Sequence, residues 1–137
     1  MQRRAFILAA LGFSALGLSA QAVPAAASPK GQSSAPAGGE LDMPLSTATV
    51  LRPQGRRAII SVESTLVIAD GALLERAKLS RPRLNAAFAD AVRVEASRML
   101  PDAVPDLNAL TRALQQAADR VLGRAGARVL LGTVMVI

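Results

Sequence analysis

One stretch of the sequence divides this chain into a part that can fold and a part that cannot. Residues 21–42 are mostly Ala, Pro, Ser and Gly, with little charge and no apolar periodicity. Such a segment cannot bury enough apolar surface to offset the conformational entropy lost on ordering. We therefore predict a disordered linker over residues 28–43 and one small folded domain over residues 44–137.

The residues before the linker have the composition of an export signal. Arg3 and Arg4 precede an apolar run over residues 5–20, and small residues suited to a signal peptidase follow. The two arginines with Phe6 resemble the twin-arginine export consensus. The apolar run is shorter than the roughly 20 residues that cross a bilayer comfortably. We predict a cleaved signal peptide over residues 1–27 and a periplasmic protein; an uncleaved leader would instead anchor it in the inner membrane.

The composition restricts the chemistry that the domain can perform. The chain contains no Cys and no His, which excludes disulfides and zinc–thiolate sites and removes the commonest general base. Phe88 is the one aromatic residue beyond the leader, so the core is aliphatic and offers no stacking platform for bases or sugars. The formal net charge is +6, but the arginines are scattered among acids. We expect no binding of nucleic acid.

The first half of the domain has the pattern of a β-hairpin followed by a short helix. Residues 45–51 are rich in β-branched side chains, and Gln54-Gly55 follows as a turn. Residues 58–69 alternate as a longer strand whose inner face is interrupted only by Ser64. Its predicted inward-facing residues are Ile60, Val62, Leu66 and Ile68. Asp70 then caps a helical turn over residues 72–79.

Two amphipathic helices come next. Ser80 is the candidate cap of a helix that has Pro82 in its first turn and an apolar stripe to about Met99. After a break at residues 101–105, Asp106 caps a second helix that Gly123 ends. The face of this second helix that we predict to be solvated carries Asn108, Arg112, Gln115, Asp119 and Arg120.

The last ten residues, 128–137, read as a strand that is apolar on both faces. One alternating set is Val129, Leu131, Met135 and Ile137, and the other is Leu130, Val134 and Val136. A strand of this kind is covered on both faces, by its own sheet or by a partner molecule. We predict that it pairs with the strand beginning near Ala58, and we take the first set as a candidate interaction surface. The fold class is α+β, in the order β-β-α-α-β.

Few side chains are candidates for catalysis or metal binding. Ser80 and Lys78 could form a dyad on paper, but residues two apart on a helix do not face each other, so we favour a helix cap beside a solvated lysine. Asp102 and Asp106 are two loop carboxylates without further oxygen ligands, which make a poor cation site. We expect no enzymatic activity, no catalytic residue, no cofactor and no metal.

A local cluster of basic residues lies where the helix restarts. It comprises Arg76, Lys78, Arg81 and Arg83. We favour a solvated junction for these side chains; the alternative is contact with anionic lipid headgroups.

Residues 59–137 resemble the periplasmic domain of the FliL family of flagellar basal-body proteins. The resemblance rests on the helix start at residues 82–88, on the helix over residues 107–122 and on the valine-rich strand at residues 129–136. It implies a non-enzymatic domain that self-associates and braces another envelope complex, such as the flagellar stator. The alternative hypothesis is a small periplasmic module that binds an apolar or lipid ligand between its helices and its sheet.

Overall fold

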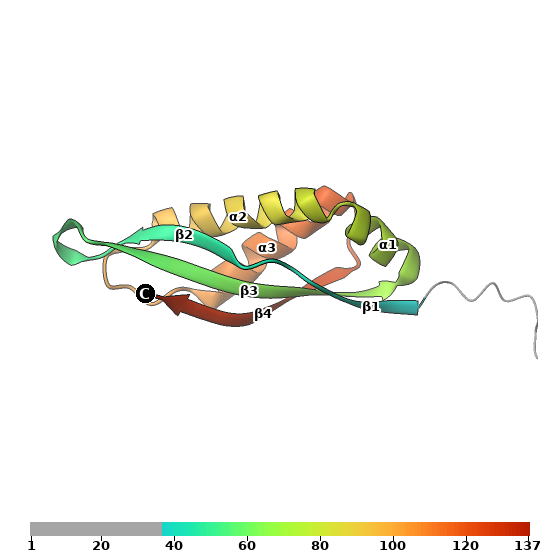
Figure 1. The fold of residues 1–137 in the computed structure, drawn as a ribbon, viewed down its shortest axis with the longest axis horizontal. Helices are drawn as coiled ribbons and strands as arrows, with labels where there is room; N and C mark the ends of the chain where they lie inside the picture. The colour runs from blue at the N-terminus through green and yellow to red at the C-terminus, as the bar shows by residue number, and fades with distance from the viewer. Residues whose placement is uncertain (1–36) are drawn as a thin grey trace, which may run out of the picture. The chain divides into compact units, whose positions relative to one another are not determined.

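The computed structural model describes residues 37–137, in which one antiparallel sheet carries three α-helices on one face (Figure 1). The predicted signal peptide and most of the predicted linker, with Arg3, Arg4 and Phe6, lie outside the described residues. The elements are β1 (Ala37–Asp42), β2 (Ser46–Leu51), the 3-10 turn η1 (Pro53–Gly55), β3 (Arg57–Asp70), α1 (Gly71–Leu79), α2 (Arg81–Arg98), α3 (Leu107–Leu122) and β4 (Ala127–Val136).

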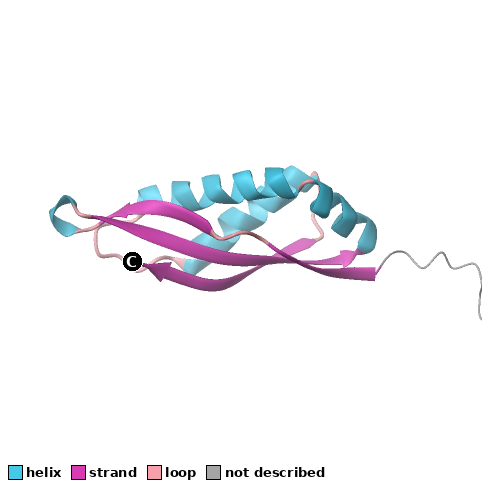
Figure 2. Cartoon of the chain, in the orientation of Figure 1, coloured by secondary structure: helices cyan, strands magenta, loops and turns pink. Residues whose placement is uncertain are grey.

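The long strand β3 is the centre of the sheet. β1 and β2 follow one another along one side of β3, and β4 pairs with its other side, all antiparallel (Figure 2). The predicted pairing of the last strand with the long strand is therefore confirmed, as is the α+β class. The helices cover one face of the sheet, and the opposite face, called the outer face below, has no helix on it in the described part of the chain.

The domain begins earlier than the sequence predicted. Residues 37–42, assigned above to the linker, form β1 and pair with the end of β3, from Ala37 opposite Asp70 to Asp42 opposite Thr65. Gly38 allows this close approach, because a Cβ at that position would lie 2.2 Å from the carbonyl oxygen of Ile68. With β1 and the separate helix α1, the observed order is β-β-β-α-α-α-β rather than β-β-α-α-β.

The core lies between the sheet and the helices. The four predicted inward-facing residues of β3 are all buried, and Phe88 of α2 is 0% exposed. The helices contribute mainly leucine and valine, among them Leu84, Val92, Leu110, Leu114 and Leu122. Two hydroxyls are exceptions: Ser46 and Ser64 are buried on the inner face with no hydrogen-bond partner among the described residues.

The helix ends follow their local sequence signals with one exception. The Asp70 carboxylate accepts a hydrogen bond from the Ala72 N–H, Asp106 accepts from Asn108 and Ala109, and Gly123 ends α3 at φ 76°. The predicted side-chain cap by Ser80 is wrong. Ser80 has near-helical dihedral angles between α1 and α2, so its backbone carbonyl accepts from Leu84 while its hydroxyl makes no capping bond.

Candidate interaction surface

The outer face of the sheet carries an exposed apolar cluster at the end where β2, β3 and β4 lie side by side. Ile59 of β3 and Ile137 directly face each other, with N···O distances of 2.7 and 3.0 Å between their backbones. Their side chains are 49% and 77% exposed, and Met135, two residues before Ile137, is 50% exposed. Leu51 of β2 lies on the same face. We call these four residues the outer patch.

A bulge in β4 divides the set of residues that the sequence predicted as one surface. Val134 lies opposite Val62 and Leu131 opposite Ser64, so two residues of β4 oppose Glu63 alone. The alternation therefore changes face at this point. Val129 is buried in the core at 3% exposure and Leu131 is partly buried, whereas Met135 and Ile137 lie exposed on the outer face. The prediction that Val129, Leu131, Met135 and Ile137 form one surface is therefore wrong. Only Met135 and Ile137 are exposed, and they lie beside Ile59 on the outer face.

The side of β4 that does not face β3 is closed over its first half. The carboxamide of Gln115 on α3 donates to the Ala127 carbonyl at 2.6 Å and accepts from the Val129 N–H at 3.0 Å. Its nitrogen also donates to Asp119. The side chain therefore occupies the place that a neighbouring strand would take, although the sequence had placed Gln115 on a solvated face.

The second half of the same side is open. Ile137 exchanges both backbone hydrogen bonds with Ile59. Because residues of an antiparallel strand point their backbone groups alternately to one neighbour and to the other, those of Val134 and Val136 point away from β3. No hydrogen bond within residues 37–137 occupies them. We call this side of residues 134–136 the open edge.

On the opposite side of the sheet, the edge formed by β1 is protected. β1 carries Glu40 and Asp42, and Pro44 follows it. The guanidinium of Arg81 donates to the Asp42 carbonyl at 2.8 Å. Charged side chains, proline and occupied carbonyls are the means by which natural sheets avoid pairing with other chains.

The predicted basic cluster does not form one continuous surface. Arg81 contacts β1 as described, and the Lys78 ammonium pairs with Glu75 at 2.9 Å. Arg76 lies beside Gly123 at the end of α3, and Arg83 is exposed on α2. Because the four basic side chains have different partners and do not converge, they favour the solvated junction over a site for a lipid headgroup.

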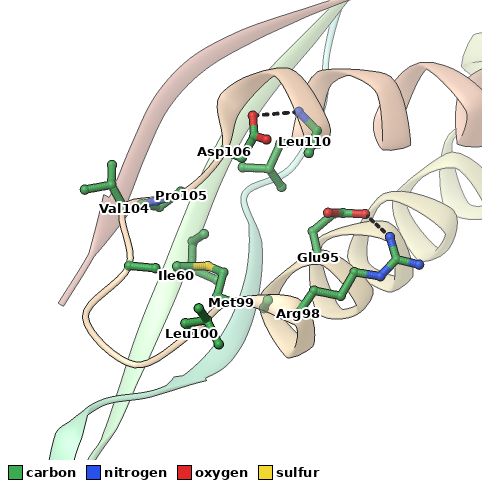
Figure 3. Close-up of a pocket in the computed structure, with 12 residues that line it drawn as sticks. Ile60, Glu95, Arg98, Met99, Leu100, Val104, Pro105, Asp106 and Leu110 are labelled. Atoms are coloured by element: carbon green, nitrogen blue, oxygen red, sulfur yellow. Dashed lines mark hydrogen bonds and ion pairs between the residues drawn. The ribbon is translucent and has the colours of Figure 1, made fainter.

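An apolar pocket of about 330 Å³ lies where the loop between α2 and α3 closes over the inner face of β3 (Figure 3). Ile60, Met99 and Leu110 line it, and the side chains of Glu95 and Arg98 lie at its α2 side. Those two side chains pair with each other at 2.8 Å, and Asp106 is occupied as the cap of α3. The polar groups around the pocket are thus already partnered.

The residues considered above for catalysis or metal binding do not come together in the structure. Lys78 is paired with Glu75 rather than with Ser80, and Asp102 lies 3.7 Å from Arg52 while Asp106 caps α3. Within residues 37–137, no three acidic side chains are placed so that they could hold a metal ion together. None of the helices in this part of the chain has the length and apolar character needed to cross a membrane.

No family model matches the chain, and no curated protein matches it. Its function is therefore inferred from the surfaces that the domain presents.

Proposed function

We propose that residues 37–137 form a non-enzymatic interaction domain that contacts other proteins through the outer patch and the open edge. The observation that carries this proposal is that Ile59, Met135 and Ile137 lie exposed together beside unpaired strand backbone. Contiguous apolar surface next to a free strand edge is the combination that protein partners use in strand addition.

We further propose that the domain works in the periplasm after export, where it supports a flagellar or other envelope complex. The signal-like composition of residues 1–27 supports the location. The resemblance of residues 59–137 to the FliL family supports the role, and the two helices and the closing strand on which that resemblance rests are present as α2, α3 and β4.

Cross-linking in living cells tests the proposal. A photoreactive residue at Ile59 (49% exposed, outer face) is compared with one at Val94 (45% exposed, on α2), so that exposure is matched and only the face differs. We expect protein adducts from position 59 and few from position 94. Equal yields from both positions, or none from position 59, would contradict the proposal.

The second candidate function is binding of an apolar ligand in the pocket under the loop between α2 and α3. Its walls of Ile60, Met99 and Leu110 and its volume of about 330 Å³ favour a small apolar molecule. It ranks second because the surrounding charges are paired and leave no free group to orient a ligand. Native mass spectrometry of the protein recovered from cells tests it: a bound molecule that is lost in Ala109→Phe, which fills the pocket, would support this function.

A further inference from the structure

We propose that one end of the domain docks on the surface of an anionic lipid bilayer. This end consists of the turn between β2 and β3, residues 52–57, and the loop between α2 and α3, residues 99–106. We call these two segments together the tip. The inference goes beyond the proposed function, because it assigns a second surface and a partner that is not a protein.

The tip is formed by two segments that are far apart in sequence. The Arg52 guanidinium lies 3.7 Å from the Asp102 carboxylate, and this contact joins the turn to the loop. Figure 1 shows both segments at the same end of the domain, with the turn extending beyond the loop. A hydrogen bond from the Arg52 N–H to the Arg56 carbonyl, at 2.8 Å, closes the turn. The side chains of the tip are therefore presented together by ordered backbone.

The turn carries positive charge that the domain does not neutralise. Arg52, Arg56 and Arg57 lie within six residues that contain no acidic side chain. Arg56 and Arg57 are exposed, and neither forms an ion pair with a carboxylate of residues 37–137. The acids of the neighbouring loop are occupied, since Asp102 contacts Arg52 and Asp106 caps α3. Two guanidinium groups thus remain for an anion, and their planar fork suits phosphate oxygens.

The loop of the tip exposes large apolar side chains beside this charge. Leu100 is 74% exposed and Val104 is 86% exposed. Each is followed by a proline, Pro101 or Pro105, which restricts its backbone to extended conformations. Less conformational freedom is therefore lost when these side chains bind. Exposed apolar groups of this kind mark a surface that meets either a protein or a membrane.

The combination favours a bilayer over a protein. Apolar anchors at protein interfaces fill well-packed pockets of the partner, whereas the fluid interface of a bilayer accepts Leu100 and Val104 without a matched pocket. Anionic headgroups supply the phosphates for Arg56 and Arg57 at the level where the apolar side chains enter. An arginine near an anionic membrane surface strengthens binding by about fivefold. We expect reversible binding that weakens as the salt concentration rises.

Vesicle binding tests the role of the charge. The whole chain is mixed with vesicles of phosphatidylcholine alone, or of an equal mixture with phosphatidylglycerol, and sedimented. Changing both Arg56→Gln and Arg57→Gln should weaken binding to the anionic vesicles by about 25-fold. Arg83→Gln with Arg128→Gln is the matched control, because both arginines are exposed and the net charge changes equally. Residues 1–36 are identical in every sample, so a difference between the two double variants reports on the tip.

Tryptophan fluorescence tests insertion of the loop. The chain contains no Trp and no Tyr, so a single introduced tryptophan reports on its own position. On addition of anionic vesicles, the emission of Val104→Trp should shift to the blue and become sensitive to quenchers attached to acyl chains. Leu79→Trp is the matched control. Leu79 is 85% exposed, against 86% for Val104, but lies on α1 at the opposite end of the domain (Figure 1), and its emission should not change.

The inference is overturned by equal binding to neutral and anionic vesicles, by equal effects of the two double variants, or by an unchanged emission at position 104. Circular dichroism verifies that each variant is folded. A protein partner is the other outcome: a photoreactive residue at Val104 that yields a discrete protein adduct in cells, and no lipid adduct, would show that the bilayer is wrong. The proposed function is tested separately at Ile59, so either proposal can fail while the other stands.

Discussion

The Gln115 side chain accepts a hydrogen bond from the Val129 N–H at 3.0 Å, which makes one side chain of α3 the cover of a strand edge. Its nitrogen donates to Ala127 at 2.6 Å and to Asp119 at 3.0 Å, so its hydrogen-bonding groups are in use. This contact joins the helical layer to β4 and marks the point where the open edge begins.

Replacement of Gln115 should therefore destabilise the domain. Gln115→Ala leaves the Ala127 carbonyl and the Val129 N–H without partners in a partly buried position, and we expect the free energy of unfolding to fall by about 1–2 kcal/mol. Urea denaturation measures the change. Gln116→Ala is the control, since Gln116 is exposed on the same helix. Equal effects of the two substitutions would show that the contact contributes nothing.

Gly38 should be needed for β1. A Cβ at this position would lie 2.2 Å from the Ile68 carbonyl oxygen, so Gly38→Ala must displace β1 from β3. We expect a loss of about 1–3 kcal/mol in unfolding free energy and faster amide exchange in β1. Gly39→Ala is the matched control, because its Cβ would meet only the end of the Leu74 side chain at 3.3 Å. An unaffected Gly38→Ala protein would contradict the position of β1.

Asp70 should make stability depend on pH. The Ala72 N–H, and after it the Arg124 side chain, hold the pKa of the Asp70 carboxyl below its usual range. A carboxyl with a depressed folded-state pKa stabilises the fold fully above the unfolded-state pKa, and this contribution is lost as pH falls through the folded-state value. Asp70→Asn keeps a capping oxygen but carries no charge.

Unfolding of the wild-type and Asp70→Asn proteins across pH checks this expectation. The wild type should be the more stable at neutral pH, and the difference should vanish at acid pH. Arg124→Gln should reduce the pH dependence without abolishing it, because the Ala72 bond remains. A difference that is constant across pH would show that the charge has no role.

The buried hydroxyl of Ser64 should not contribute to stability. Ser64 is 4% exposed on the inner face, and its oxygen has no partner among the described residues. Removing an unpartnered buried hydroxyl relieves its desolvation penalty, so Ser64→Ala should leave the unfolding free energy unchanged or raise it by about 1 kcal/mol. A fall in unfolding free energy of more than about 1 kcal/mol, measured by thermal or urea denaturation, would show that the hydroxyl makes a stabilising hydrogen bond.

The sequence predicted those features that depend on local signals. The inner face of β3 follows from alternation, and the helix ends at Asp70, Asp106 and Gly123 follow from short-range capping. The sequence missed β1 because a strand containing Gly38 and Gly39 has the composition of a linker, and only its pairing with β3 orders it.

The candidate site was predicted only in part, for a related reason. The bulge opposite Glu63 moves Met135 and Ile137 to the outer face. Within β4, Gly132 is the one residue whose type could have indicated a bulge. Gln115 likewise had no local signal, because its role depends on where α3 lies against β4. The bulge and the Gln115 contact both depend on a segment distant in sequence, and alternation or helical periodicity within one segment does not specify them.

Amide hydrogen exchange at residues 134–137 tests the central claim most directly. The Ile137 N–H is bonded to Ile59 and should be protected at every protein concentration. The amides of Val134 and Val136 point away from β3 and should exchange rapidly in the isolated protein. They should become protected when the partner captured through position 59 is bound. Protection of both amides in the isolated protein, or rapid exchange that persists when the partner is bound, would contradict the account.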